Sequence, residues 1–200
     1  MPERAHPEHR EYQDRRIGLF KKIPNRFRVE MFRRYKFCNK YIKGKIVADI
    51  PCGNGWGNQR LKGAKHIYGF DYATDAVAYA NGHYRSKMRS FKVGDMTRLK
   101  LTKNKYDVIM CLDGIEHINK LEGEEFIQSV IHGLKDGGLF ILNTPILNRD
   151  GRGTKNPYHK HEYAEAEIIE LLVKYFSIKK IDIYPGPELR TFRFVGTKCP

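Results

Sequence analysis

The 200-residue chain lacks several features that would assign it to a familiar class of protein. No apolar run reaches the roughly 18 residues that a membrane-spanning helix needs, and residues 1–7 have no apolar core of the kind that a secretory signal carries. The four cysteines form no C-x-x-C pair and show no zinc-binding spacing. Internal repeats, low-complexity tracts and proline- or serine-rich linkers are missing too. These absences favour one compact domain over residues 1–200, with reduced thiols, in the cytoplasm.

Acidic residues are scarce beside basic ones, which gives the chain a net charge of +14 at neutral pH. Residues 1–45 contain fourteen lysines and arginines against five acids, interleaved with tyrosine and phenylalanine. One interpretation is a basic face for a nucleic acid or a phosphorylated substrate. The other is a pair of amphipathic helices, over about residues 9–20 and 27–41, with solvated basic faces. Helical spacing in the second segment favours this interpretation for the aromatic residues.

The most informative segment is a short apolar run that opens into three closely spaced glycines. Residues 46–50 have the pattern of a buried parallel strand, and Gly53, Gly55 and Gly57 follow it. Such glycines allow positive φ angles and let a ligand lie against bare main chain. We expect a helix to begin directly after the turn and to offer free amide groups to a negative group of the ligand. Asn58 breaks the dinucleotide pattern G-x-G-x-x-G, so the segment predicts a nucleotide-type cofactor site without naming the cofactor.

Further strands and helices alternate after this turn, as a parallel α/β sheet requires. Asp71 closes the second strand, where its carboxylate could accept two hydrogen bonds from a ribose diol. Thr74 is placed to cap the next helix, and Asn81 with Gly82 to end it. The expected strands cover residues 66–71, 89–93, 106–112, 139–143, 176–183 and 191–196, and the expected helices cover residues 75–80, 121–134 and 164–175.

Five motifs follow one another along the chain: Asp49-Ile-Pro-Cys-Gly-Asn-Gly55, Gly69-Phe-Asp71, Gly94-Asp-Met96, Asp113-Gly-Ile-Glu-His-Ile118 and Leu134-Lys-Asp-Gly-Gly-Leu139. In this order the chain resembles the class I S-adenosylmethionine-dependent methyltransferases over nearly its whole length. It is also similar to a bacterial and phage-type subgroup associated with glycan biosynthesis, through Glu3-Arg4, Arg34-Tyr35 and Asn156-Pro-Tyr-His-Lys-His-Glu-Tyr163. The resemblance implies a single-domain, Rossmann-like α/β fold. Its sheet would be seven-stranded and mostly parallel, with a C-terminal antiparallel hairpin and helices on both faces.

The resemblance also implies which residues hold S-adenosylmethionine. Asp49, Gly53, Asn54 and Gly55 would hold the methionyl half, and Asp71 would hold the ribose. Asp95 and Met96, a polar group beside an apolar side chain after the third strand, would hold the adenine. The full cofactor-binding set is Asp49, Gly53, Asn54, Gly55, Asp71, Tyr72, Asp95, Met96, Leu112 and Asp113.

Catalytic candidates lie near the carboxyl ends of the strands, where open α/β sheets bind ligands. Methyl transfer from a sulfonium donor needs an acceptor that is positioned and often deprotonated. Glu116 and His117 follow the fourth strand, and imidazole suits a general base near neutral pH. A long loop over residues 145–162 adds His159 and Glu162, and long loops in compact domains are commonly lids. The alternative is structural: Glu116 or His117 caps a turn, while His159 and Glu162 anchor the loop.

A different grouping of the same residues suggests a metal site. Asp113, Glu116, His117 and His159 resemble the ligands of small-RNA 3′-terminal 2′-O-methyltransferases, where a divalent ion would bind both hydroxyls of a terminal ribose. Asp113 stands where that family has its first glutamate, and residues 161–163 read His-Glu-Tyr instead of Phe-Glu-Trp. These departures put the four-ligand site in doubt, and a divalent metal is not expected.

The sequence as a whole predicts an S-adenosylmethionine-dependent methyltransferase that acts on a hydroxyl oxygen of a small-molecule or glycan acceptor, phosphorylated acceptors included. Residues 1–45 and 145–162 would recognise the acceptor. The runner-up is a metal-dependent RNA 3′-terminal 2′-O-methyltransferase or another nucleic-acid methyltransferase. A nicotinamide-dependent oxidoreductase would fit the glycine turn, but we expect no second domain to bind its substrate. A basic nucleic-acid-binding protein without catalysis would bind RNA and fail to bind the cofactor.

Overall fold

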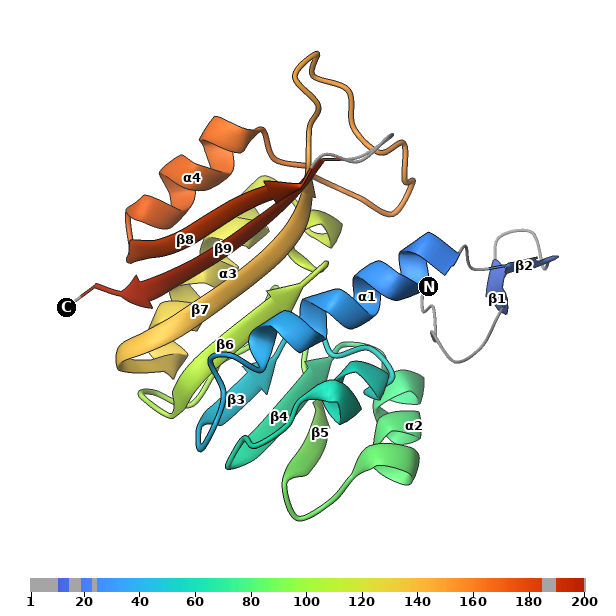
Figure 1. Cartoon of the computed structure of the whole chain (residues 1–200), viewed down its shortest axis with the longest axis vertical. Coiled ribbons are helices and arrows are strands. Elements are labelled where there is room, and N and C mark those ends of the chain that lie inside the picture. The colour runs from blue at the N-terminus through green and yellow to red at the C-terminus, as the bar shows by residue number, and fades with distance from the viewer. Residues whose placement is uncertain (1–10, 15–18, 23–24, 185–189, 200) are drawn as a thin grey trace.

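A seven-stranded sheet forms the centre of the computed structural model, which describes residues 11–14, 19–22, 25–184 and 190–199 (Figure 1). The strand order is β5-β4-β3-β6-β7-β9-β8. Neighbours from β5 to β7 run parallel, and β9 lies antiparallel between β7 and β8. The strands are β3 (Ile46–Asp49), β4 (His66–Asp71), β5 (Arg89–Val93), β6 (Tyr106–Leu112), β7 (Leu134–Ile146), β8 (Phe176–Tyr184) and β9 (Arg190–Lys198).

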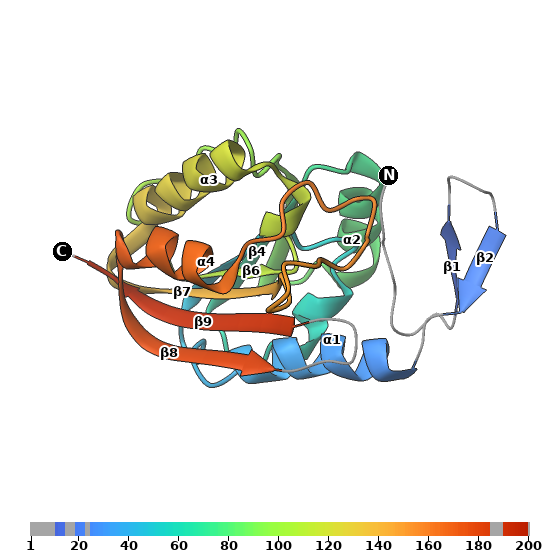
Figure 2. The same cartoon turned by 90° about the horizontal axis from the view of Figure 1, so that it is seen from above.

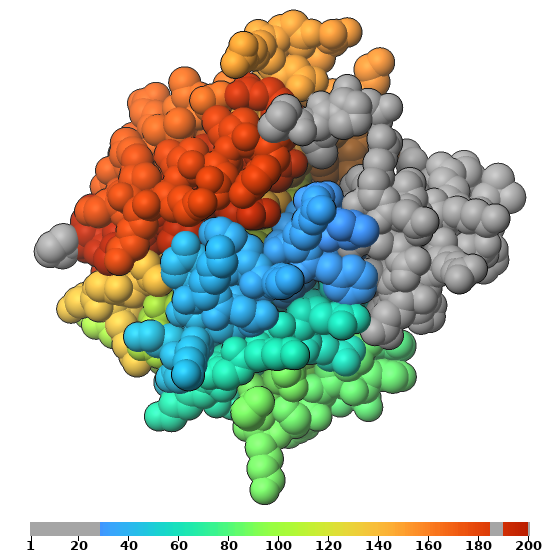
Figure 3. All heavy atoms as spheres, viewed as in Figure 1, coloured from blue at the N-terminus to red at the C-terminus, as the bar shows by residue number. Residues whose placement is uncertain are grey.

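Helices cover both faces of this sheet (Figure 2). On one face, α3 (Lys120–Gly133) and α4 (Glu165–Val173) contribute apolar side chains to the larger core cluster. On the other, α1 (Asn25–Cys38) packs Tyr35 and Cys38 against β3 and β6. The space-filling view shows α1 in blue between the red C-terminal strands and the green region of β4 and α2 (Figure 3).

Burial explains why the central strands are almost continuously apolar. In β6, every residue except Asp107 is buried, because helices cover both faces of a parallel sheet. The expected fold, with its parallel sheet and C-terminal antiparallel hairpin, is confirmed. All four cysteines are free thiols. Within the described residues, no helix is both long and apolar enough to cross a bilayer.

The expected helix over residues 9–20 is wrong. Where the structure describes this segment, it forms two short strands, β1 (Glu11–Asp14) and β2 (Leu19–Lys22), which pair antiparallel. Tyrosine and phenylalanine favour strands more than helix interiors, so the interleaved aromatics there signal a strand pair. The second expected helix is confirmed as α1, with its end three residues earlier than predicted.

The helix after β4, α2 (Thr74–Tyr84), is longer than predicted. Thr74 is its first residue, while Ala73 is the N-cap and makes no side-chain cap bond, so the predicted cap is wrong. Asn81 and Gly82 do not end the helix. The amide of Asn81 donates to the carbonyl oxygens of Val77, 3.1 Å away, and Phe91, 3.0 Å away, which fixes it inside the last turns.

Gly57 is required by close packing beneath α1. A Cβ atom there would lie 2.1 Å from Cζ of the Tyr35 ring, while one at Gly82 would meet nothing within 4 Å. We therefore expect Gly57→Ala to lower the free energy of unfolding by about 1–3 kcal/mol through overpacking. Gly82→Ala, in the helix interior, should raise it by roughly 0.5–1 kcal/mol. Urea denaturation of both variants measures these changes, and equal effects would contradict the packing argument.

Candidate active site

The predicted site residues meet along the carboxyl edge of four neighbouring strands. Asp49 ends β3, Asp71 ends β4 and Leu112 ends β6, while Asp95 follows β5. The strand order β5-β4-β3-β6 puts these four ends side by side. Open parallel sheets bind ligands outside this edge, so the sequence places its polar groups where the topology offers a site.

The glycine turn after β3 has the conformation that a close-lying ligand needs. Gly53 has φ 56° and Gly55 has φ 83°, both in the left-handed region that favours glycine. A Cβ atom at Gly53 would meet nothing within 4 Å, whereas one at Gly55 would lie 2.8 Å from Cβ of Ala80. Gly55 is therefore required by packing, while Gly53 keeps open space in front of the main chain.

The helix expected after this turn is much shorter than predicted. Trp56–Arg60 forms a five-residue 3-10 helix, η1, and the amide of Asn58 already donates to the carbonyl oxygen of Gly55. Fewer helix amides are therefore free for a negative group than expected, and their role stays a prediction. The chain turns early because Trp56 and Asn58 are both buried beneath α1. Asn58, which breaks the dinucleotide pattern, donates to Asp49 at 2.7 Å.

Asp49 supports the turn from inside the protein. Its carboxylate is fully buried and accepts hydrogen bonds from the Tyr35 hydroxyl at 3.1 Å and from the Asn58 amide. Burial raises its pKa to about 7, although both hydrogen bonds oppose the shift. Within the described residues, its other oxygen, Oδ1, is buried without a hydrogen-bond partner, and the contact of Asp49 with the methionyl half stays a prediction.

Asp71 shapes the turn from the neighbouring strand. One carboxylate oxygen accepts from the amide of Gly53 at 2.9 Å, and the other accepts from the amide of Ala73 at 3.0 Å. A carboxylate has about four acceptor positions, so each oxygen can take one further hydrogen bond. These two remaining positions suit a ribose diol. Tyr72, the next residue, is half exposed.

The candidates for the adenine lie one strand further out. Asp95 accepts hydrogen bonds from the Thr97 amide at 2.9 Å and the Thr97 hydroxyl at 2.8 Å, so it also orders its own turn. Met96 is partly buried and packs against the larger core cluster. The pair follows β5, beside the end of β4 that carries Asp71.

Asp113 joins a polar group that the sequence did not assign to the site. Its carboxylate pairs with Arg34 of α1 and accepts from the Asn143 amide at 2.9 Å. Burial lowers the pKa of Arg34 to about 10, so the guanidinium stays charged at neutral pH. Two features of the sequence could have pointed to this group: the Arg-Tyr pair ahead of the first strand, and Asn143 at the end of an apolar run. Asp113 itself has φ 54°, a left-handed conformation that no local pattern predicted.

Glu116 and His117 belong to a short 3-10 helix, η2 (Ile115–His117), directly after β6. Glu116 is 1% exposed and accepts from the Thr144 hydroxyl at 2.9 Å. Burial raises its pKa to about 7, while the hydrogen bond from Thr144 and the nearby charge of Arg34 act in the opposite direction. Glu116 thus changes its charge near neutral pH, at the edge where the cofactor candidates gather.

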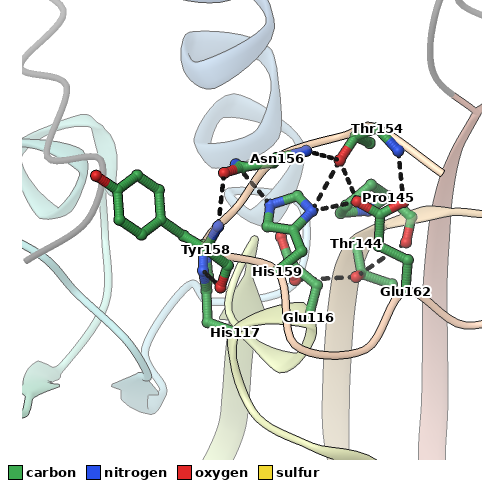
Figure 4. A network of polar contacts seen from close by, with 9 residues as sticks. All are labelled: Glu116, His117, Thr144, Pro145, Thr154, Asn156, Tyr158, His159 and Glu162. Atoms are coloured by element: carbon green, nitrogen blue, oxygen red, sulfur yellow. Dashed lines mark hydrogen bonds and ion pairs between the residues drawn. The ribbon is translucent and has the colours of Figure 1, made fainter. Parts of the chain in front are cut away.

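The loop after β7 returns to this pair (Figure 4). It begins after Ile146, because β7 extends two residues into the predicted loop. The carbonyl oxygen of Glu116 accepts from the amides of Lys160 at 2.8 Å and His161 at 3.2 Å. Nδ1 of His117 lies 3.2 Å from the carbonyl oxygen of Tyr158. The loop is therefore docked on η2 largely through main-chain atoms.

His159 is held on both ring nitrogens. The Asn156 amide oxygen accepts from the amide of Tyr158 at 3.1 Å, which turns its nitrogen toward Nε2 of His159, 2.9 Å away. Nε2 must then accept, so Nδ1 carries the hydrogen and donates to Glu162. The Thr154 hydroxyl also contacts Nδ1 of His159 and the Glu162 carboxylate. This arrangement fits the anchoring role predicted as the alternative for His159 and Glu162.

Three of the four candidate metal ligands come together. Ligand atoms of Glu116, His117 and His159 all lie within 4.8 Å of one another, so these residues could hold a cation. Asp113 is not part of this group, because its carboxylate pairs with Arg34. A cation at His159 would also have to replace a contact to Glu162 or Asn156.

The buried carboxyl of Glu116 predicts a specific dependence of stability on pH. Its pKa is raised from 4.5 to about 7 in the folded protein, so its stabilising contribution is complete below pH 4.5 and is lost as the pH rises toward 7. Glutamine imitates the neutral acid. The unfolding free energy of Glu116→Gln minus that of the unmodified protein should therefore rise between pH 5 and 7, by at most about 1.4 kcal/mol per pH unit. Urea denaturation at each pH measures this difference in unfolding free energy. The control is Glu125→Gln, at an exposed position, for which the difference should not change with pH.

Comparisons with known proteins agree with this geometry. Residues 47–138 match a family model described as a methyltransferase domain. A probable S-adenosylmethionine-dependent methyltransferase from Mycolicibacterium smegmatis is 32% identical over 150 residues, which cover 70% of this chain and 56% of the relative. A tRNA U34 carboxymethyltransferase from a Sulfurovum species is 25% identical, covering 60% and 40% of the two chains. A ubiquinone biosynthesis O-methyltransferase from Paraburkholderia phytofirmans is 27% identical, covering 55% and 47%.

The chain spans about half the length of these curated relatives. Among solved structures, an S-adenosylmethionine-dependent methyltransferase from Mesorhizobium loti aligns with a TM-score of 0.66 at 15% identity, covering 79% of this chain and 93% of that one. At this identity the alignment bears on the fold alone. Residues 47–138 thus match a methyltransferase domain, and the sequence relatives and the strand order agree with an S-adenosylmethionine-dependent methyltransferase.

Proposed function

We propose that this protein transfers a methyl group from S-adenosylmethionine to a hydroxyl oxygen of a small-molecule or glycan acceptor, with His117 as the general base. One observation carries the proposal. Nδ1 of His117 faces the carbonyl oxygen of Tyr158 at 3.2 Å. A carbonyl oxygen only accepts, so Nδ1 carries the hydrogen and Nε2 is the basic nitrogen.

The chain's own residues fit the cofactor. Gly53 leaves open space before the main chain, and Asp71 keeps an acceptor position on each oxygen for the ribose hydroxyls. Asp95 and Met96 lie beside them for the adenine, and Asn54, Tyr72 and Leu112 complete the edge. When bound, S-adenosylmethionine supplies an activated methyl group on a sulfonium sulfur.

In this proposal the protein positions the acceptor and removes its proton. Nε2 of His117 takes the hydroxyl proton, which leaves the oxygen lone pair ready for the methyl carbon. Glu116 lies beside His117 in η2 and, when ionised, stabilises the imidazolium that forms. His159 and Glu162 hold the loop that completes the pocket wall.

The relatives support the reaction type but divide on the acceptor. The ubiquinone relative is named for O-methylation and the Sulfurovum relative for a tRNA nucleoside. We favour a small-molecule or glycan hydroxyl, phosphorylated acceptors included, because in this proposal His117 and Glu116 remove the hydroxyl proton by themselves. In this proposal residues 1–200 act as one cytoplasmic domain, with residues 1–45 and 145–162 beside the acceptor. The glycan-biosynthesis subgroup stays part of this proposal.

Asp71→Ala should weaken S-adenosylhomocysteine binding well over tenfold. The substitution removes two charge-assisted hydrogen bonds to the ribose, each contributing roughly 1.5–3 kcal/mol. Calorimetric titration measures the change, with NAD as a second ligand that should not bind the unmodified protein. An unchanged affinity would remove the ribose assignment, and tight NAD binding would remove the cofactor assignment.

His117→Ala should retain cofactor binding and lose most of its turnover. A positioned general base contributes about 100-fold to 10,000-fold to a rate. The matched control is His132→Ala, which removes an exposed imidazole from the last turn of α3 and should leave the rate unchanged. Turnover of S-adenosylmethionine is followed by mass spectrometry with a panel of phenols and glycans. Full activity of His117→Ala would exclude the base role.

The cluster of Glu116, His117 and His159 favours one second candidate, a metal-dependent methyltransferase of RNA ends. We expect the first function, so Mn²⁺ should not alter S-adenosylhomocysteine affinity or the rate on small acceptors. Methylation of an RNA 3′ end that requires Mn²⁺ and is lost in His159→Ala would establish the second candidate instead.

A further inference from the structure

Positive charge is concentrated in the half of the chain that builds β3, β4 and β5. Residues 36–105 contain fifteen lysines and arginines against four acids. Residues 106–200 contain twelve against fourteen. The excess charge of the described protein therefore belongs to one side of the sheet.

The four acids of residues 36–105 all lie toward the catalytic edge. Asp49 ends β3, Asp71 ends β4, Asp75 lies in the first turn of α2 and Asp95 follows β5. Two of them, Asp49 and Asp71, are buried. The opposite ends of the same strands are consequently left without acids from this half of the chain.

The last four residues before each of β3, β4, β5 and β6 include two basic residues, and these segments lie at the lower left of Figure 1. Seven of the eight side chains are exposed, and Lys105 is partly buried with its ammonium 3.8 Å from the centre of the Tyr68 ring. We call these eight residues the amino-end face: Lys43 and Lys45 before β3, Lys62 and Lys65 before β4, Arg85 and Lys87 before β5, and Lys103 and Lys105 before β6.

Few acids among the described residues compensate the amino-end face, although the charge of Lys45 helps to lower the pKa of the nearby Asp107. In the described part of the chain, none of its eight residues forms an ion pair. The nearby Asp107 is occupied by the amide of Ile46 at 2.7 Å and by Lys135 at 2.9 Å. Several lysines of residues 106–200 do form ion pairs, among them Lys120 with Glu167 and Lys180 with Asp182.

The loops hold these charges in fixed positions. The amide of Gly44 donates to Gly63 at 2.7 Å, and that of Lys65 donates to Lys45 at 2.8 Å, which joins the first two loops. The amide of Lys105 donates to Gly133 at 3.0 Å and ties the fourth loop to α3. Repulsion between ordered like charges opposes folding, and a bound polyanion offsets that cost.

The layout suits a chain of phosphates more than a single anion or a membrane. Four adjacent strands spaced about 4.8 Å apart spread the pairs over roughly 15 Å. Membrane insertion would use apolar side chains beside the charges. Among these loops, Met88 is the single large apolar residue that is strongly exposed, at 41%.

We propose that the amino-end face is a docking surface for the phosphate backbone of a nucleic acid, separate from the acceptor site. The seven residues of β6 place the face about 20 Å from the catalytic edge. The bound nucleic acid anchors the protein. Binding does not depend on the nucleotide sequence, because lysines contact phosphates without recognising bases. This proposal does not depend on which acceptor is methylated.

The test compares two charge-matched double variants of the full chain. Lys65→Gln with Lys87→Gln removes two charges from the amino-end face. Lys174→Gln with Lys179→Gln removes two exposed charges from the other half. Binding of a fluorescein-labelled 20-nucleotide single-stranded RNA is measured by anisotropy from 50 to 300 mM KCl. The first variant should bind about tenfold more weakly at 100 mM salt, with a salt slope smaller by about 1.4. The control should match the unmodified protein.

Three outcomes would overturn the proposal. The first is that the unmodified protein does not bind the RNA at 100 mM KCl, and the second is that both double variants weaken RNA binding equally. The third is that the charges of the amino-end face are needed for binding to vesicles containing 30% phosphatidylserine and not for binding to RNA. Calorimetry with S-adenosylhomocysteine is run on the same samples. Intact cofactor binding in the first variant separates a failure of RNA docking from a failure of the proposed methyl transfer.

Discussion

A buried carboxylate at the end of the central strand organises the cofactor half of the molecule. Asp49 of β3 accepts hydrogen bonds from Tyr35 of α1 and Asn58 of η1, and so joins three consecutive elements. Losing either donor would leave a buried acceptor with less compensation, which costs more than an exposed hydrogen bond does. The position of the glycine turn, and hence of Gly53, depends on this junction.

Helix α1 also contacts the part of the site that follows β6. Arg34 precedes Tyr35 on α1 and pairs with Asp113 after β6, while its charge also lowers the pKa of Glu116. The positive charge of Arg34 allows the carboxyl groups of Asp113 and Glu116 to lie at the same edge of the sheet. Without it, each negative charge would raise the pKa of the other group. α1 thus sets both the shape and the electrostatics of the carboxyl edge.

The sequence predicted those features that follow from local patterns. Apolar runs ending in Asp49 and Asp71 identified the parallel strands, and the fold follows from their order. The predictions from the sequence failed where a contact between different elements determines the local structure. Trp56 and Asn58 are buried beneath α1, which shortens the expected helix, and Asn81 is retained in α2 by its bond to Phe91 of β5. The pairing of Arg34 with Asp113 spans 79 positions, and no local pattern reports such a contact.

The way the 147–162 loop docks has a consequence for how this protein diverges. Its attachments to η2 use the carbonyl oxygens of Glu116 and Tyr158 and the amides of Lys160 and His161. Every residue type except proline supplies these donors and acceptors. An exposed position such as Lys160 can therefore be replaced while the loop keeps its path. Under the proposed function, acceptor preference can then change by substitutions in a loop whose backbone stays in place.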